Sequence, residues 1–112
     1  MKLQTIETHI VKTPPPGFGG RYFIFVVLQT ACGIRGFGEI YAASFPPETV
    51  STMAADVFGR YLEDQKPFGI ELFWRRAQVA GFSHRHDPSM QGVVSGLEMA
   101  CWDIVGKALD RP

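Results

Sequence analysis

An uninterrupted apolar run lies early in the chain, between a loop rich in proline and glycine and a short turn. Residues 21–29 read Arg-Tyr-Phe-Ile-Phe-Val-Val-Leu-Gln. β-Branched and aromatic side chains favour strands, and the lack of polar alternation is typical of a strand covered on both faces. The seven apolar residues from Tyr22 to Leu28 fall far short of the ~20 that a membrane-spanning helix needs. We therefore expect a buried strand, with helices of this chain on one face and a further partner on the other.

Two more strands are expected on either side of this run. Residues 2–12 carry Thr, Ile and Val at intervals without Gly or Pro, and residues 34–41 follow a tight turn at residues 30–33. That turn predicts an antiparallel hairpin. Gly36 and Gly38 share one face of the third strand, where another backbone or a bulky side chain can approach closely. The first half of the chain thus predicts a three-stranded antiparallel sheet.

The second half of the chain changes to the helical period. Asp87 is expected to cap the last helix, with Pro88 in its first turn. This last helix is apolar around most of its circumference, which indicates burial on more than one side. The predicted strands cover about 2–12, 21–29 and 34–41, and the predicted helices about 47–63, 70–80 and 88–109. We expect one α+β domain over residues 1–112, a sheet followed by a helical layer.

Length and charge exclude several classes of protein. The 112 residues fit one domain, and 11 basic and 11 acidic side chains balance to a net charge of zero. This balance argues against a nucleic-acid binder and against a polybasic membrane anchor. Cys32 and Cys101 show neither metal nor redox spacing. The opening residues, Met1 to Glu7, contain no apolar signal region, so we expect a cytoplasmic location without membrane or nucleic-acid partners.

No complete catalytic constellation is found in the sequence. The densest polar cluster is His84-Arg85-His86-Asp87. We interpret it first as a solvated loop before the helix cap, second as a segment that lines a site, and third as a zinc site. Cys101 lies within an apolar helix and is interpreted as a packing residue. Asp103 and Lys107 stand at i, i+4 and predict a helix-surface ion pair.

The chain is more apolar in its second strand and last helix than a domain of this size needs. We infer a missing partner, either further chain or another subunit. An isolated chain is then expected to be marginally stable or prone to associate, because apolar faces remain in water. A stand-alone α+β module that binds a partner protein through these faces is the alternative, and the intact mass of the native gene product separates the two.

Two stretches of the sequence form family motifs. Residues 95–109 read Ser-Gly-Leu-Glu-Met-Ala-Cys-Trp-Asp-Ile-Val-Gly-Lys-Ala-Leu, and residues 33–39 read Gly-Ile-Arg-Gly-Phe-Gly-Glu. They resemble the helix and the hairpin strand of the N-terminal capping domain of the enolase superfamily, in its mandelate racemase/muconate lactonizing enzyme group. An opening strand at 2–11 and a helix beginning Pro47-Glu48-Thr49-Val50 follow the family's order, so the resemblance spans essentially the whole chain.

The resemblance implies an enzyme of two domains, of which this chain is the cap. In such enzymes a (β/α) barrel follows, binds Mg²⁺ through three carboxylates, and carries the Lys or His bases that remove the proton α to a substrate carboxylate. It implies no catalytic residue and no metal ligand in this chain, so the fragment alone is expected to be inactive. The implied reaction is the dehydration of an acid sugar, with racemisation or epimerisation and cycloisomerisation as alternatives. A homo-oligomer is expected for the full-length protein.

Two cap loops carry over from the resemblance, Pro14–Gly20 and Ala42–Pro47. They shape the substrate pocket and exclude water when they close. Arg21, at the exit of the first loop, is interpreted first as a surface charge and second as a contact to a substrate carboxylate. The pocket-lining residues expected in this chain are Phe18, Gly19, Arg21, Tyr41, Ser44 and Phe45.

Overall fold

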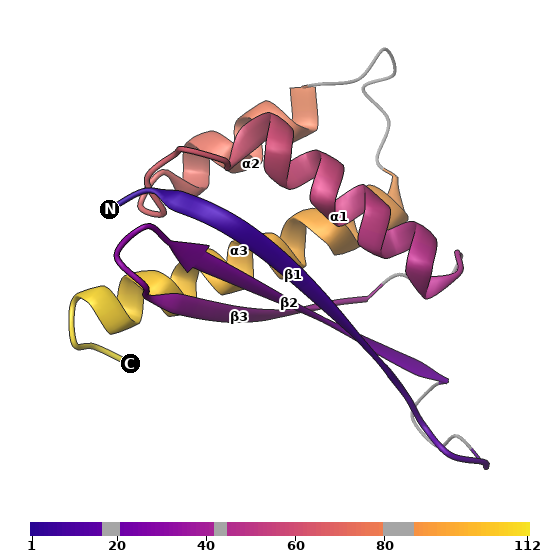
Figure 1. Ribbon diagram of the computed structural model, residues 1–112. Coiled ribbons are helices and arrows are strands. Elements are labelled where there is room, and N and C mark those ends of the chain that lie inside the picture. The colour runs from indigo at the N-terminus through magenta and orange to yellow at the C-terminus, as the bar shows by residue number, and fades with distance from the viewer. Residues whose placement is uncertain (17–20, 42–44, 80–86) are drawn as a thin grey trace.

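The computed structural model describes residues 1–16, 21–41, 45–79 and 87–112. A three-stranded antiparallel sheet in the order β1-β2-β3 is followed by three helices (Figure 1). The strands are β1 (Leu3–Lys12), β2 (Tyr22–Thr30) and β3 (Arg35–Ile40), and the helices are α1 (Pro47–Tyr61), α2 (Ile70–Val79) and α3 (Pro88–Ala108). The predicted fold class, a sheet followed by a helical layer, is confirmed.

The helices cover one face of the sheet. Alternate residues of β2, namely Ile24, Val26 and Leu28, point toward the helices and are almost fully buried. On the opposite face Phe25 is 39% exposed and Phe37 of β3 is 52% exposed. The expected cover on the second face of β2 is therefore not found within the described residues.

The helical layer is built around α3, which packs on β3 and β2 and is contacted by α1 and α2. Asp87 begins this helix as predicted: one of its carboxylate oxygens accepts hydrogen bonds from the backbone N–H of Ser89 (2.9 Å) and of Met90 (3.4 Å). Pro88 occupies the first turn, where no N–H is needed. Val93, Leu97, Ala100 and Ile104 of α3 form the centre of the core with the inner residues of the sheet.

The closest packing joins β3 to α3. A Cβ atom on Gly36 would stand 2.1 Å from the carbonyl oxygen of Ala100, and one on Gly38 would stand 2.0 Å from that of Gly96. A Cβ on Gly96 would itself meet a side-chain carbon of Ile40 at 2.4 Å. The predicted close approach at Gly36 and Gly38 is confirmed, and it is backbone of the last helix that approaches.

Two side chains of α3 close the outer edge of β3. Asp103 Oδ2 accepts a hydrogen bond from the backbone N–H of Phe37 (2.9 Å), and Lys107 Nζ donates one to the carbonyl oxygen of Arg35 (2.9 Å). The same two side chains form the predicted i, i+4 ion pair at 2.6 Å. Backbone groups that an edge strand usually leaves open to another chain are thus occupied here.

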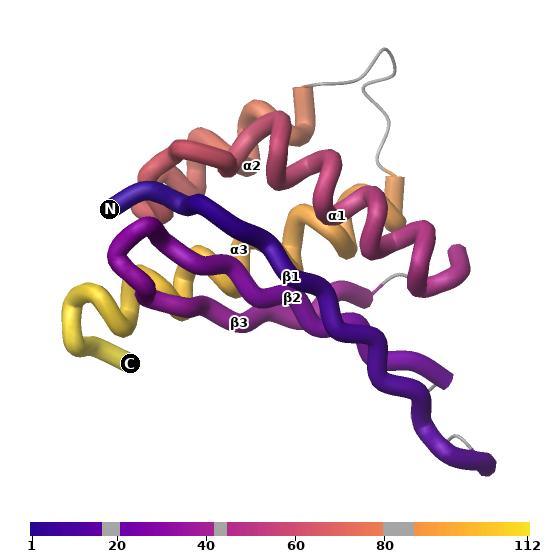
Figure 2. The backbone as a smooth tube through the Cα atoms, in the orientation of Figure 1, coloured from indigo at the N-terminus to yellow at the C-terminus, as the bar shows by residue number. Residues whose placement is uncertain are grey.

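The hairpin of β1 and β2 extends beyond the helices as an arm, which the backbone trace shows at the end of the molecule away from both termini (Figure 2). Leu3 at the other end of β1 is tied to the loop after α1 by two backbone hydrogen bonds of 2.9 Å, with Asp64 and Gln65. Within the described ranges, no helix has the length and apolar character to cross a membrane.

Candidate functional site

The hairpin arm exists because β1 and β2 are longer than β3. β3 ends at Ile40, which pairs with Ile24, whereas β1 and β2 stay paired to Lys12 and Tyr22. A further backbone bond, from Thr13 N–H to the carbonyl oxygen of Arg21 (3.0 Å), continues the ladder toward the proline-rich loop. This pairing sets Lys12 opposite Tyr22 and Thr13 opposite Arg21, so the side chains of Lys12 and Arg21 leave the ladder on opposite faces at the arm's end.

A pocket of about 370 Å³ lies at this end of the arm. Lys12 Nζ stands 5.9 Å from the centre of the Tyr22 ring, a cation–π distance. The two proline rings in its wall fix their own backbone φ angles and offer no N–H donors. The wall therefore combines two positive charges with rigid apolar surface. Its described residues are Lys12, Thr13, Pro15, Pro16, Arg21 and Tyr22.

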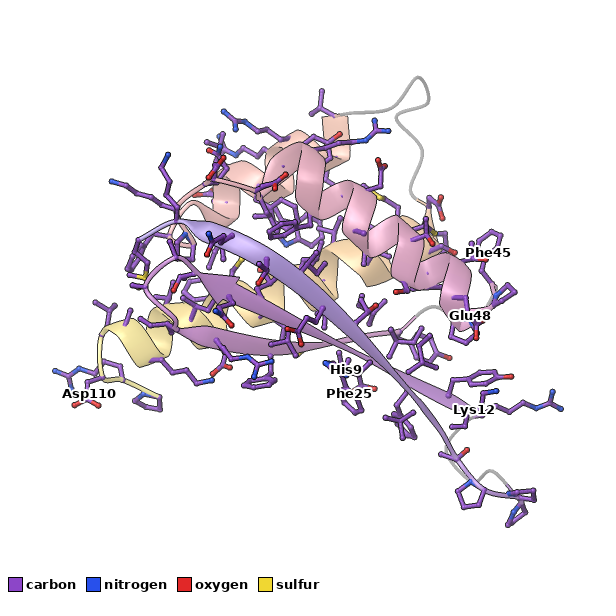
Figure 3. All side chains as sticks on the ribbon, in the orientation of Figure 1. His9, Lys12, Phe25, Phe45, Glu48 and Asp110 are labelled. Carbon is purple, nitrogen blue, oxygen red and sulfur yellow. The ribbon has the colours of Figure 1, made fainter. Side chains whose placement is uncertain are left out.

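The segment after β3 presents aromatic side chains at the same end of the sheet. Tyr41 is 79% exposed and Phe45 is 49% exposed. Figure 3 shows Phe45 with Glu48 at the start of α1, and Lys12 on the hairpin arm. Tyr41 directly follows Ile40, whose partner is Ile24, so it leaves the sheet where β3 ends and the hairpin arm begins.

The structure places the six predicted pocket residues unequally. Arg21 lines the pocket at the tip, while Tyr41 and Phe45 are exposed and, in the part of the chain that the structure describes, do not line it. Phe18, Gly19 and Ser44 lie outside the described residues. Arg21 is exposed at the exit of the loop, and its interpretation first as a surface charge and second as a substrate contact stays a prediction.

Sequence reasoning missed Lys12 and Tyr22 as lining residues. The signal that identifies them is their position, since they form the last pair of the ladder on either side of the Pro14–Gly20 loop. Antiparallel pairing brings such flanking residues within a few ångströms of one another. The histidines of the cluster at 84–87 lie outside the described residues.

Among the residues that the structure describes, the acidic side chains do not form a cluster that fits Mg²⁺. Magnesium ions are held by converging carboxylates and water, and the described ranges contain no group of three or more His, Cys, Asp or Glu side chains that could hold a metal. Glu7 instead contacts Arg35 (3.3 Å) and His9 (3.4 Å) on the open face of the sheet. Figure 3 shows His9 and Phe25 on that face.

Cys101 is a packing residue, as predicted. Its side chain is fully buried in α3, and this burial raises the pKa of the Cys101 thiol to about 12, with a smaller contribution from the carboxylate of Glu98. A thiol with such a pKa holds its proton near neutral pH and is a poor nucleophile.

A second groove, of about 470 Å³, lies at the opposite end of the molecule beside the start of β1. It combines three basic side chains, from Lys2, Lys66 and Arg76, with the apolar floor made by Leu62 and Phe73. Its distance from the arm is set by the length of β1, ten residues or ~30 Å. The groove is therefore separate from the pocket at the hairpin tip.

Comparison with known proteins gives a consistent result. Residues 6–112 match the family model of the mandelate racemase/muconate lactonizing enzyme, N-terminal domain. The chain belongs to this family. A solved structure from Labrenzia alexandrii DFL-11 is 56% identical, with a TM-score of 0.93 over 97% of this chain and 28% of that one. A mandelate racemase/muconate lactonizing enzyme from Jannaschia sp. CCS1 is 49% identical, with a TM-score of 0.92 over the same shares of the two chains.

A curated relative is the D-galactonate dehydratase of Klebsiella pneumoniae (strain 342). It is 36% identical over 90 residues, which make up 80% of this chain and 23% of the dehydratase. The chain thus spans about a quarter of the length of the relatives that it matches. It corresponds to the N-terminal domain of mandelate racemase/muconate lactonizing enzymes, within the enolase superfamily.

The family motif on α3 forms hydrogen bonds that stabilise the fold of this domain. Glu98 accepts hydrogen bonds from two indole N–H groups, those of Trp74 in α2 and of Trp102 (3.3 Å for the latter). Asp103 and Lys107 of the same motif hold the edge of β3. The motif therefore joins α3 to α2 on one side and to the sheet on the other, which fixes the base of the hairpin arm.

Proposed function

We propose that this chain is the substrate-capping domain of a Mg²⁺-dependent enzyme that removes the proton α to a carboxylate, and that the enzyme is an acid-sugar dehydratase. The observation that carries the proposal is the family match over residues 6–112. The 36% identity to a D-galactonate dehydratase favours dehydration among the reactions of the family. The partner of the cap is then a (β/α) barrel in the remainder of the protein.

The cap's part in this reaction is to bind, orient and enclose the substrate. The pocket at the hairpin tip offers Lys12 and Arg21 to an anionic group, and Tyr41 and Phe45 offer apolar cover at the same end of the sheet. We assign Phe18, Gly19 and Ser44 to the same lid. Exclusion of water by such a lid strengthens the electrostatic interactions within the closed site.

The metal and the acid–base groups belong, in this proposal, to the remainder of the protein. The described acidic side chains of the cap do not form a metal cluster. We assign Mg²⁺, its ligands and the bases to the barrel, and we expect the full-length protein to act as a homo-oligomer in the cytoplasm.

The test uses the full-length protein, Mg²⁺ and a panel of acid sugars in deuterated water. Dehydration forms a 2-keto-3-deoxy acid with loss of water, whereas racemisation or epimerisation introduces deuterium at the α carbon without loss of water. Cycloisomerisation forms or opens a ring without loss of water, and the product is identified by this change in its bonding. Absence of both α-proton exchange and product with every acid of the panel contradicts the proposal.

A stand-alone interaction module is the second candidate, and the exposed apolar side chains of α3 favour it. Met99 is 48% exposed and Trp102 is 58% exposed on neighbouring turns of the helix, a pattern that marks a docking surface. The intact mass of the native gene product decides between the two. A mass near 12.5 kDa supports the module, whereas one of about 45 kDa, as the 28% coverage of relatives implies, supports the enzyme.

A further inference from the structure

We propose that two copies of the full-length protein pack sheet against sheet, through the face of β1, β2 and β3 that is turned away from the helices. This outer face has Phe25 of β2 at its centre. The contact is symmetric, about a two-fold axis that runs along β2. It goes beyond the proposed function, because it concerns the contact between subunits and holds for any reaction of the enzyme.

The middle of the outer face is apolar. Phe25 is 39% exposed, Val11 of β1 is 47% exposed and Phe37 of β3 is 52% exposed. The ring of Phe23 lies beside that of Phe25, with centroids 6.3 Å apart and planes 9° from parallel. Val11 pairs with Phe23, and Phe37 is a diagonal neighbour of Phe25. Apolar side chains of all three strands thus adjoin one another in water, which is typical of an interaction surface.

Charged side chains flank this apolar centre on both outer strands. His9 of β1 and Glu39 of β3 both pair with Phe25, one from each side. Within one copy His9 lies 3.4 Å from Glu7, and Glu7 also contacts Arg35 at 3.3 Å. The side chain of Glu39, in contrast, forms no ion pair with any residue that the structure describes. A carboxylate that is unpaired beside an apolar surface can pair with a complementary group of a second molecule.

The two-fold axis along β2 brings complementary groups together. It lays β1 of one copy over β3 of the other, as in sheets that pack nearly aligned at a separation of about 10 Å. His9 then lies over Glu39 of the second copy, and an imidazole offers at least one N–H donor to such a carboxylate. An axis across the strands through Phe25 would instead place Glu39 over Glu39, which is unfavourable because like charges repel.

The outer face and the surface of α3 that carries Met99 and Trp102 face different partners. α3 belongs to the helical layer, whereas the outer face lies on the other side of the sheet (Figure 1). A barrel that packs against the helical layer therefore leaves the outer face open. A second copy fits this face, because a symmetric contact requires a surface that matches itself, and the pairing of His9 with Glu39 provides this match.

The first test identifies what covers position 25 in the full-length protein. The photo-reactive analogue benzoylphenylalanine replaces Phe25, which keeps an aromatic side chain there, and the irradiated protein is separated under denaturing conditions. The control carries the analogue at Leu72 of α2, which is 50% exposed. We expect at least about tenfold more linked dimer from position 25 than from position 72, because the effective concentration within a formed dimer far exceeds that in dilute solution. Mass spectrometry is expected to show position 25 linked to strands of the sheet in a second copy.

The second test exchanges the charges of the pair. His9→Glu places a carboxylate over Glu39 of the second copy, and Glu39→Lys removes the acceptor of His9 and replaces it with a cation. We expect each variant alone to associate at least about fivefold more weakly than the native protein. A mixture of the two variants is expected to recover native association, because a copy with two carboxylates then meets a copy with histidine and lysine. Sedimentation velocity of the full-length proteins gives the three affinities.

A matched variant controls for the change of charge. Glu63→Lys makes the same substitution in the exposed turn after α1, outside the outer face. We expect it to associate like the native protein, both alone and mixed with His9→Glu at the level of that variant. Thermal unfolding of each variant shows whether the fold is retained.

The outcomes decide the proposal independently of the reaction. Absence of a linked dimer, or links from position 25 to any segment other than the sheet of a second copy, overturns it. A mixture of His9→Glu and Glu39→Lys that associates no better than either variant alone overturns the two-fold arrangement and with it the proposal. An enzyme that exchanges no α proton overturns the proposed function only, since both tests apply to that protein unchanged.

Discussion

At the scale of single residues, the backbone contact between β3 and α3 depends on glycine. A Cβ at position 38 would stand 2.0 Å from the carbonyl oxygen of Gly96, and this neighbour is backbone that cannot rotate away. We expect Gly38→Ala to lower the free energy of unfolding by more than about 3 kcal/mol, because the strand and the helix have to separate. Urea denaturation of the 112-residue chain measures this change.

Gly59→Ala is the matched control for that substitution. Gly59 is exposed on α1, and the nearest atom to its added Cβ would be a carboxylate oxygen of Glu63 at 3.9 Å. Because alanine is the better helix former, we expect this variant to gain about 0.5–1 kcal/mol of stability. A Gly38→Ala protein as stable as the native chain would contradict the close packing of β3 on α3.

The buried thiol of Cys101 makes stability depend on alkaline pH. Burial raises the pKa of this thiol from its ordinary 9.0 to about 12. Between these values the unfolded chain releases a proton that the folded chain keeps, so the stabilising contribution is full below pH 9 and is lost as the pH rises toward 12. The slope reaches at most about 1.4 kcal/mol per pH unit.

Cys101→Ala isolates this effect from the lysines and tyrosines that titrate in the same range. The variant loses packing at every pH, and we expect its free energy of unfolding to fall less steeply than that of the native chain between pH 9 and pH 12. Urea denaturation at several pH values, with both proteins side by side, gives the difference. Parallel slopes would show that the thiol of Cys101 is not shielded from water.

At the scale of elements, the edge of β3 depends on a helix residue far away in sequence. Asp103 accepts the Phe37 N–H and pairs with Lys107, and both side chains are partly exposed, by 34% and 44%. We expect Asp103→Ala to cost about 1–2 kcal/mol, because the N–H loses its acceptor and Lys107 loses its partner. Asp103→Asn keeps an acceptor and is expected to cost less.

Asp56→Ala is the control for Asp103→Ala at the edge of β3. It breaks only the exposed ion pair of Asp56 with Arg60 on α1. Such pairs contribute little, within about 0.5 kcal/mol. Thermal unfolding of the three variants orders them, with Asp103→Ala the least stable. Equal stability of Asp103→Ala and Asp56→Ala would mean that the contact between α3 and the β3 edge adds nothing to stability.

The same elements show what the sequence predicts and what it leaves open. Gly36 and Gly38 predict the close approach of another segment, because they share one face of the strand. Asp87-Pro88 predicts the start of a helix. Both signals are local in the sequence. The i, i+4 spacing also predicts the ion pair of Asp103 with Lys107. Their bonds to the edge of β3 depend on how the helix lies across the sheet, which local spacing does not determine.

The candidate site, too, could be predicted from the sequence only in part. The position of Arg21 at the exit of the loop is visible in the sequence, but the pairing of Lys12 with Tyr22 is identified only once the register of β1 and β2 is known. A shift of β1 by one residue would turn the Lys12 side chain to the other face of the arm. The register therefore had to come from the structure, and with it the pocket.

At the scale of the whole molecule, two apolar surfaces remain open on the described part of the chain. One carries Phe25 and Phe37 on the far face of the sheet, and the other carries Met99 and Trp102 on α3. Large apolar side chains that remain in water favour association. We expect the isolated 112-residue chain to form oligomers whose size grows with concentration.

Sedimentation velocity over a range of concentrations measures this association, and Met99→Ser with Trp102→Ser tests the helix surface. Loss of two large exposed apolar side chains is expected to shift the distribution toward monomer. Leu72 and Val79 of α2 are also exposed, by 50% and 66%. Their matched change is expected to have a smaller effect, because they lie on another helix and are two turns apart, whereas Met99 and Trp102 are one turn apart. A stable monomer at all concentrations would contradict an exposed interface.

The proposal assigns substrate enclosure to this domain and the catalytic groups to the remainder of the protein, so it predicts that the 112-residue chain alone is inactive. Proton abstraction next to a carboxylate requires a base of suitable pKa within hydrogen-bond reach and a group that stabilises the developing charge. The described residues offer two cations and exposed aromatic side chains at the arm, and they contain no cluster of metal ligands. We expect the 112-residue chain with Mg²⁺ to exchange no α proton of any acid sugar, as measured by NMR in deuterated water, while the full-length protein does so. Exchange by the 112-residue chain alone would place catalytic groups in the cap and would contradict its assignment as a binding and enclosing domain.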